Sequence, residues 1–149
     1  MPISLLKAKE KHLFTTYRWA NEKVTLRNSI TGKKITLEGH KNWFKKYITS
    51  KNKLMKIVYL NKKPIGLVRL DKMYGNYYIS YLIDKNYRGK RHAYMALSKY
   101  IKKVKSLKKN KKIFAIVKKN NIPSVKIFNK LKFNLISKNK HLLKYCFKI

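Results

Sequence analysis

The sequence predicts one domain of the mixed α/β (α+β) class, in which a largely antiparallel central sheet is flanked by helices. The chain has 149 residues, 44% of them hydrophobic and 13% aromatic, which is enough for one ordinary core. Helical periodicity fills the first third, strand-like runs separated by turn signals fill the middle, and the two patterns alternate afterwards. With no linker or internal repeat, residues 1–149 form one domain.

The first third reads as helical. Residues 12–28 carry apolar side chains at helical spacing with one break, and residues 37–48 form an apolar stripe at intervals of three and four. Three consecutive antiparallel strands should follow at residues 54–60, 65–70 and 77–83, joined by the turns NKKP and YGN. Asp71 then reads as an ordinary turn residue.

The second half alternates between helix and strand. The expected elements are, in order, a helix over 93–107, a strand over 113–117, a helix over 125–131, and strands over 133–136 and 142–147. Lysines between 102 and 112 suit a helix C-terminus, and Pro123 suits the first turn of the second helix. Cys146 should be a small buried residue in the last strand.

The charge is extreme, at +34 from 39 basic and 5 acidic residues. Because the lysines are dispersed and accompany many Asn, Ile and Tyr residues, we attribute the charge to a bias toward AT-rich codons and expect no specific nucleic-acid partner. A basic nucleic-acid-binding module is the alternative hypothesis, and salt-dependent DNA retention would support it. The positive field should in any case attract polyanionic ligands.

Other patterns limit location and chemistry. The N-terminal segment lacks an apolar region followed by a cleavage site, and no uncharged stretch approaches the ~20 apolar residues of a membrane span. We therefore expect a cytoplasmic protein with no membrane partner. A single cysteine excludes an internal disulfide, and no Cys/His spacing predicts a metal site. The sequence leaves monomer and homodimer open.

The strongest local feature is a strand that ends at Asp84, followed by a short basic loop with Gly89 and then a long amphipathic helix. Unpaired backbone N–H groups in such a loop, together with the helix dipole, favour a bound pyrophosphate. The junction therefore predicts a phosphate-binding site.

The segment YLIDKNYRGKRHAYMAL resembles the GNAT superfamily of N-acetyltransferases, and the resemblance covers nearly the whole chain. It implies acetyl-CoA as cosubstrate and a loop of the form (Gln/Arg)-x-x-Gly-x-(Gly/Ala) whose amides hold the pyrophosphate. The implied contacts are Arg88, Gly89, Lys90, Arg91, His92 and Ala93. Arg91 replaces the usual central glycine, and we expect it to keep its N–H and a negative φ while adding a cation.

The same resemblance implies further contacts to the cosubstrate. The backbone of Leu82 and Ile83 would pair with the pantetheine arm like an added strand. The segment NIPSVKIFNKLKF matches the family's Asn-x-x-Ser…Lys-x-Gly-Phe pattern, which implies that Asn121 and Ser124 contact coenzyme A. In that segment, Phe133 is a packing residue, Lys132 replaces a glycine, and Phe128 replaces a tyrosine that serves as general acid in many relatives.

Proton transfer has few candidates because the chain has only five acidic residues. Asp84 reads as a cap for the loop. Tyr81, with its neighbour Ser80, is the favoured proton-handling group, and a water chain is the alternative. Since a thiolate is a good leaving group, no single side chain should be indispensable as general acid.

The segment YRWANEKVTLRNSITGKKITLEGHKNWFKKYI resembles acetyltransferases of nucleotide-linked 4-amino sugars in pseudaminic acid-type pathways. The resemblance implies that Arg27 and His40 lie near the nucleotide of the acceptor, while Trp19 and Trp43 read as packing residues. The expected reaction is acetyl transfer from acetyl-CoA to the primary amine of such a sugar. An acetyltransferase of protein N-termini, of the ribosomal-protein type, is the alternative with the same coenzyme A site.

Overall fold

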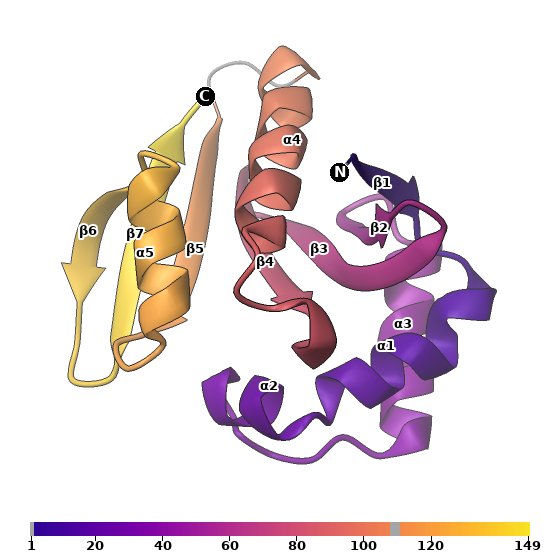
Figure 1. Cartoon of the computed structure of the whole chain (residues 1–149). Helices are drawn as coiled ribbons and strands as arrows, with labels where there is room; N and C mark the ends of the chain where they lie inside the picture. The colour runs from indigo at the N-terminus through magenta and orange to yellow at the C-terminus, as the bar shows by residue number, and fades with distance from the viewer. Residues whose placement is uncertain (1, 108–110) are drawn as a thin grey trace.

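The computed structural model describes residues 2–107 and 111–149 and contains one seven-stranded sheet (Figure 1). The strands are β1 (Ile3–Lys7), β2 (Lys53–Leu60), β3 (Lys63–Met73), β4 (Asn76–Ile83), β5 (Lys112–Lys118), β6 (Asn134–Lys138) and β7 (Leu142–Lys148). Their order in the sheet is β1-β2-β3-β4-β5-β7-β6. Neighbouring strands are antiparallel except β4 and β5, which are parallel. The expected mixed and largely antiparallel sheet is confirmed.

Helices cover both faces of this sheet. They are α1 (Leu13–Ala20), α2 (Lys23–Asn28), α3 (Leu37–Thr49), α4 (His92–Leu107) and α5 (Ile122–Lys130), with short 3₁₀ turns at η1 (Glu10–His12) and η2 (Lys85–Tyr87). Alternation along β2 divides the core into two layers, because Ile57 packs with α1 and α3 whereas Val58 packs with α4. Figure 1 shows α4 and α5 on the near side of the sheet, with α1 to α3 gathered below.

The structure corrects two expectations and leaves part of a third outside its range. The chain begins with a strand, because Ile3–Lys7 pairs antiparallel with β2, and five residues are too few to show a clear period. Asp71 lies inside β3 opposite Tyr78, and its carboxylate accepts a hydrogen bond from the Tyr47 hydroxyl at 2.7 Å, so it is not a turn residue. Residues 108–110 of the lysine-rich stretch lie outside the described residues.

The parallel pair β4–β5 is short. Only Tyr77 and Tyr78 of β4 are in register with Ile113 and Phe114 of β5, although both strands continue beyond these residues. Past this point β4 keeps its pairing with β3, and β5 keeps its pairing with β7. The sheet therefore splits between its two halves, and the facing edges of β4 and β5 lack strand partners there.

Candidate active site

A cleft of about 1260 Å³ opens where β4 and β5 separate. Its lining includes residues 79–83 of β4, residues 87–89 and 91–94 of the loop and helix start, and the beginning of α5. It continues along α2 and the segment before α3, and it reaches Trp43 of α3 and Arg69 of β3. The cleft therefore runs through the split sheet and connects its two faces.

Alternation along β4 gives the cleft two chemically different sides. The Tyr81 ring lies 6.2 Å from that of Phe128 on α5, and the Tyr81 hydroxyl is 2.5 Å from Ser124 Oγ, which defines the α5 side. Ser80 points the opposite way and lies across from Arg69, whose guanidinium rests on Trp43 of α3, which defines the α3 side. The two residues expected to handle protons therefore face different sides of the cleft.

The backbone of β4 presents only alternate residues to the gap. Asp84 N–H donates to the Ile65 carbonyl at 2.7 Å. Hydrogen-bonded pairs recur at every second residue of an antiparallel ladder, so Leu82 is also hydrogen-bonded to its β3 partner, Leu67. The groups that face the gap come from Tyr81 and Ile83, and the Ile83 carbonyl accepts a hydrogen bond from Arg88 Nε at 3.0 Å. The register therefore turns the backbone groups of Tyr81 and Ile83 toward the gap and engages those of Leu82 with β3.

The 88–93 loop takes its shape from two left-handed residues. Gly89 has φ +76°, and Arg91 has φ +66°, in the region that favours glycine. The expectation of a negative φ at Arg91 is therefore wrong, because the loop retains the backbone shape of a glycine. The Arg91 guanidinium lies 5.8 Å from the Tyr94 ring centroid, which keeps a cation beside the first turn of α4.

Arg88 has a structural role that the motif did not reveal. Its guanidinium forms two 3.2 Å hydrogen bonds with Glu22 and a third, at 3.1 Å, with Thr25 Oγ1. Burial alone would raise the pKa of Glu22. The hydrogen bonds from Arg88 and from the Thr25 amide outweigh this effect and lower the pKa from 4.5 to about 2. This ion pair joins α2 to the 88–93 loop.

The remaining predicted loop residues differ in exposure. Lys90 is exposed and does not line the cleft, whereas Gly89, His92 and Ala93 line it. His92, the first residue of α4, is buried, and its Nδ1 has no hydrogen-bond partner within the described residues. Burial, and then the charge of Lys90, lower the pKa of His92, so its ring is neutral near pH 7.

The α5 side is shaped by the helix start that the sequence predicted. Asn121 caps α5 by accepting from Ser124 N–H at 3.4 Å, and Pro123 stands in the first turn. Burial raises the pKa of Tyr81, and the Ser124 hydrogen bond only partly opposes this, so the hydroxyl stays protonated near neutral pH. Phe133, the expected packing residue, lies edge-on to the Phe128 ring, with the two ring centroids 5.0 Å apart.

Residues of the N-terminal motif form the frame of the α3 side. Trp19 Nε1 donates to Asp84 Oδ2 at 2.9 Å, while Asp84 Oδ1 caps η2, so the expected capping role of Asp84 is confirmed. Asn21 clamps the backbone of Ile35, donating to its carbonyl at 2.9 Å and accepting from its N–H at 2.8 Å. The clamp fixes the segment that leads into α3.

The two predicted acceptor residues occupy unequal positions. His40 is 0% exposed, its Nε2 lies 2.9 Å from Thr16 Oγ1, and burial lowers its pKa. Its ring stacks on Phe44 with centroids 5.9 Å apart, so His40 contributes to the wall of the cleft from a fully buried position. Arg27 is exposed on α2 and is not among the residues that line the cleft.

Arg69 is the site residue that sequence reasoning missed. Its Cζ lies 5.3 Å from the Trp43 ring centroid, and its Nη1 donates to the Tyr47 hydroxyl at 3.2 Å. An arginine in the middle of an otherwise apolar strand, at IGLVRL, was the available signal. Trp43 is partly buried against the α1–α3 core layer, consistent with the expected packing role.

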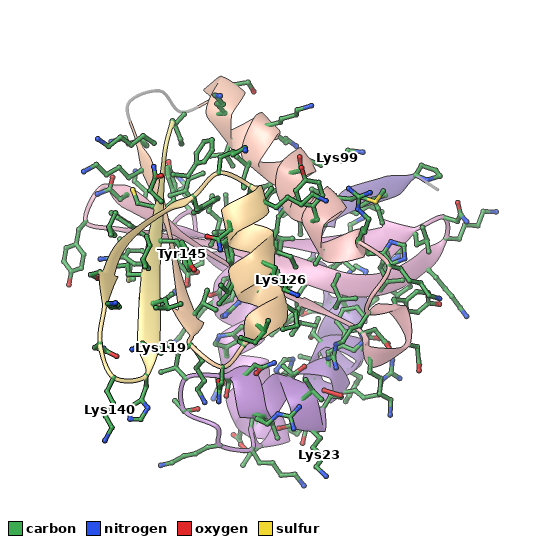
Figure 2. The ribbon with its side chains drawn as sticks, turned by 60° about the vertical axis from the view of Figure 1, so that its left-hand side comes forward. Lys23, Lys99, Lys119, Lys126, Lys140 and Tyr145 are labelled. Atoms are coloured by element: carbon green, nitrogen blue, oxygen red, sulfur yellow. The ribbon has the colours of Figure 1, made fainter. Side chains whose placement is uncertain are left out.

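The charges of the cleft are one-sided. Its lining contains lysines and arginines from both sides of the sheet, and none of the described lining residues is Asp or Glu. Lysines also cover the rest of the molecule, since Figure 2 labels them on α2, α4 and α5 and beside the strands. The cleft therefore suits a ligand that carries negative charge.

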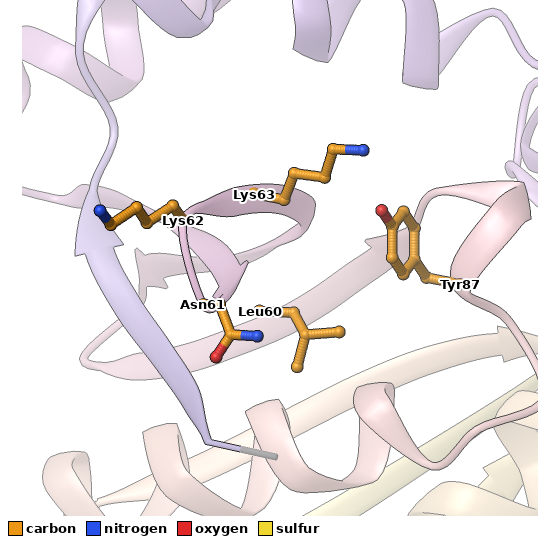
Figure 3. A pocket seen from close by; sticks show the side chains of 5 residues that line it. All are labelled: Leu60, Asn61, Lys62, Lys63 and Tyr87. Carbon is orange, nitrogen blue, oxygen red and sulfur yellow. The ribbon is translucent and has the colours of Figure 1, made fainter.

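A second hollow of about 340 Å³ lies at the β2–β3 turn beside Tyr87 (Figure 3). Its other lining residues are Leu60, Asn61, Lys62 and Lys63, a set without carboxylate, imidazole or thiol groups. Across residues 2–107 and 111–149, no cluster of three or more His, Cys, Asp or Glu side chains is placed to hold a metal ion. No helix in the same ranges is long and apolar enough to cross a membrane.

Comparison with known proteins gives a family and a fold. No curated protein sequence matches the chain. Among solved structures, a domain from Methanocaldococcus jannaschii has a TM-score of 0.88 at 21% identity, with 99% of each chain covered. RimL, a ribosomal L7/L12 alpha-N-protein acetyltransferase in complex with coenzyme A, has a TM-score of 0.86 at 13% identity, covering 99% of this chain and 94% of that one.

Spermidine N-acetyltransferase from Vibrio cholerae, in complex with coenzyme A and spermine, has a TM-score of 0.84 at 14% identity, covering 97% of this chain and 94% of that one. At these identities the likeness shows the fold alone. Residues 3–134 match the family model of the acetyltransferase (GNAT) domain, a range that includes the 88–93 loop, β4 and α5. The chain therefore belongs to the GNAT acetyltransferase family, whose members use acetyl-CoA.

Proposed function

We propose that this acetyltransferase acetylates the primary amine of a nucleotide-linked amino sugar. The observation that carries the proposal is the charge of the cleft, which has Lys33, Lys34 and Arg69 on its α3 side and no carboxylate among its described lining residues. Such a lining attracts a nucleotide diphosphate and repels a polyamine, whose several cations would find no partner. The resemblance of the N-terminal third to amino-sugar acetyltransferases points the same way.

Acetyl-CoA supplies the activated acetyl thioester, and the chain offers groups that suit it. The amides of the 88–93 loop and the N-terminus of α4 would hold the pyrophosphate, with Arg91 as an added cation. The gap-facing backbone of Tyr81 and Ile83 would pair with the amides of the pantetheine arm. Asn121, at the start of α5, lines the same gap.

In the reaction, the amine nitrogen bonds to the acetyl carbon as the carbon–sulfur bond breaks. The amine gives up one proton, and the departing thiolate takes one up. Tyr81 would donate to the thiolate, a role supported by its hydroxyl on the α5 side, which stays protonated near neutral pH. Ser80 faces the opposite side, where its hydroxyl can hydrogen-bond the incoming amine or its water.

Arg27 and His40 stay predictions as acceptor residues. From its place on the surface of α2, Arg27 would bind the outer part of the nucleotide, and His40 would act by supporting Trp43, 5.2 Å away. Arg27→Ala should therefore raise the KM of the sugar nucleotide, and His40→Ala should disturb the α3 side of the cleft. Unchanged kinetics in both variants would remove these two residues from the site and leave the reaction in place.

The deciding experiment is an acceptor panel at fixed acetyl-CoA, in which free thiol release is measured. It compares UDP-linked 4-amino-4,6-dideoxy sugars, spermidine and peptides with free N-termini. We expect turnover with the sugar nucleotides and little with spermidine. Acetylation of the peptides alone would refute the sugar proposal in favour of a protein N-terminal acetyltransferase.

A further inference from the structure

We infer that Arg69 is a specificity-determining residue that binds the diphosphate of the acceptor on the α3 side of the cleft. The inference rests on the proposed function and adds a recognition residue that the sequence motifs did not indicate. It begins with position, because Arg69 lies opposite Ser80 in the β3–β4 ladder and lines the cleft beside Trp43. Its guanidinium is therefore a neighbour of the strand at which the acetyl group is transferred.

The side chain of Arg69 is held in place. Its guanidinium lies over two aromatic rings, 5.3 Å from the Trp43 centroid and 5.7 Å from that of Tyr47. Its Nη1 donates to the Tyr47 hydroxyl at 3.2 Å, and that hydroxyl donates to Asp71 at 2.7 Å. A cation fixed in this way loses little conformational entropy when it binds a ligand.

Arg69 is held without being neutralised. Among the described residues, no carboxylate lies within ion-pair distance of it. The nearest acid in the network, Asp71, is engaged by the Tyr47 hydroxyl and by Lys53 at 3.7 Å. By contrast, the charge of Arg88 in the 88–93 loop is neutralised by Glu22 at the start of α2. Arg69 therefore keeps its charge and most of its five N–H donors for a ligand.

The chemistry of the acceptor fits this position. In a 4-amino sugar linked to a nucleotide, the amine and the first phosphate stand at opposite ends of one sugar ring. An amine at the β4 edge therefore directs the phosphate away from the gap, toward the α3 side of the cleft. A guanidinium fork matches paired phosphate oxygens, and Lys33 and Lys34 add to the positive potential there.

The test measures UDP binding by calorimetry with protein first saturated with coenzyme A, so that the cosubstrate's own diphosphate site is filled. Arg69→Gln should weaken UDP binding about tenfold, and Arg69→Lys should weaken it less, since lysine keeps the charge without the fork. Arg18→Gln is the matched control, because Arg18 is an exposed arginine outside the cleft and its loss removes the same unit of charge. Coenzyme A affinity reports that each variant is folded.

An activity assay adds a second readout by comparing the UDP-linked amino sugar with the methyl glycoside of the same sugar. Arg69→Gln should lower kcat/KM about tenfold for the first acceptor and much less for the second, which has no diphosphate. Equal UDP affinity in Arg69→Gln and Arg18→Gln, or equal losses on both acceptors, would overturn the inference. If wild-type protein binds UDP through Arg69 but acetylates neither sugar, the proposed function falls and the diphosphate site stands. If Arg69→Gln fails to fold, the Arg69→Lys comparison decides.

Discussion

The two sides of the cleft are built in different ways. On the α5 side, short sequence segments form the site through their backbones, namely the 88–93 loop and the start of α5. On the α3 side, side chains from α2, α3 and β3, far apart in the sequence, are brought together by hydrogen bonds and ring contacts. The difference suggests that binding of the common cosubstrate depends on local backbone shape, whereas acceptor choice depends on tertiary placement of side chains.

The strongest test of this contrast concerns Tyr81, a β4 residue that serves the α5 side through its side chain. Tyr81→Phe should reduce kcat by about 100-fold without abolishing activity, because it removes the hydroxyl proposed to handle the proton and leaves that task to water. Coenzyme A affinity should stay near the wild-type value, since the gap-facing groups at this position are backbone. Steady-state kinetics across pH together with calorimetry would check both parts.

A rescue variant sharpens the result. Phe128 occupies the position where the family resemblance places a general-acid tyrosine, and its ring lies 6.2 Å from that of Tyr81. Phe128→Tyr alone should leave activity largely intact, and combined with Tyr81→Phe it should restore part of the lost rate. Full activity of Tyr81→Phe at every pH would instead assign the proton to water.

The next effect concerns the Glu22–Arg88 pair, which joins the two sides. The pKa of Glu22 is lowered from 4.5 to about 2, so its contribution to stability is present above pH 4.5 and is lost as pH falls toward 2. Glu22→Gln keeps an acceptor for the α2 cap but should lower the free energy of unfolding at pH 7 by about 2 kcal/mol, allowing for partial solvent screening. Urea unfolding at several pH values measures this.

Between pH 4.5 and 2 the wild-type protein should therefore lose stability more steeply than Glu22→Gln, and the two should converge at the acidic end. Parallel loss of stability in both proteins would show that the pair contributes nothing measurable to folding.

Gly89 tests the backbone character of the α5 side. Gly89→Val should weaken coenzyme A binding about tenfold, because a β-branched residue resists φ +76° and the loop must move. Gly75→Val is a matched control, since Gly75 has φ +78° and open space around its Cβ position, as Gly89 does, but lies in the β3–β4 turn outside the cleft. The two variants should lose similar amounts of stability, but only Gly89→Val should lose coenzyme A affinity. A similar loss of affinity in Gly75→Val would contradict the proposed role of the loop.

The smallest effects are expected at Arg91 and Lys132, which occupy glycine-like conformations with φ +66° and +69°. A left-handed conformation in a residue other than glycine destabilises the folded state by roughly 1–2 kcal/mol. Replacing that residue with glycine removes this strain, but the greater freedom of glycine in the unfolded chain offsets about 0.4–1 kcal/mol of the gain. Arg91→Gly and Lys132→Gly should therefore each stabilise the protein by about 0.5 kcal/mol. Thermal unfolding, with Tyr74→Gly at φ +52° for comparison, would measure the gain.

What the sequence could predict follows the same division. The 88–93 loop, the start of α5 marked by Pro123 and the Phe133 packing position were predictable because each depends on a few adjacent residues. The positive φ of Arg91 was not predicted, because the conformation that the loop requires overrides the preference of an arginine for negative φ. The strand Ile3–Lys7 was missed because its pairing with β2 is a tertiary contact.

The α3 side was harder to predict. Periodicity correctly placed Trp43 and His40 on one helix face, but it could not show that the His40 ring would bond to Thr16 or that Arg69 would line the same cleft. Arg88 illustrates the same limit, because the motif implied a loop contact to the cosubstrate and could not show that the side chain would pair with Glu22. In each case the decisive partner lies more than twenty residues away in the sequence.

The short β4–β5 pairing also has a consequence for folding cooperativity. The part of the chain that contains β5, α5, β6 and β7 is joined to the remaining sheet by a ladder only two residues deep. A cosubstrate that hydrogen-bonds to the exposed edge of β4 would fill the break and connect the two parts mechanically. Amides of β5 and β7 should then exchange with solvent more slowly when acetyl-CoA is present, and at one hundred times Kd the folded state should gain about 2.7 kcal/mol. Binding of acetyl-CoA would thus join the two halves of the sheet in every catalytic cycle.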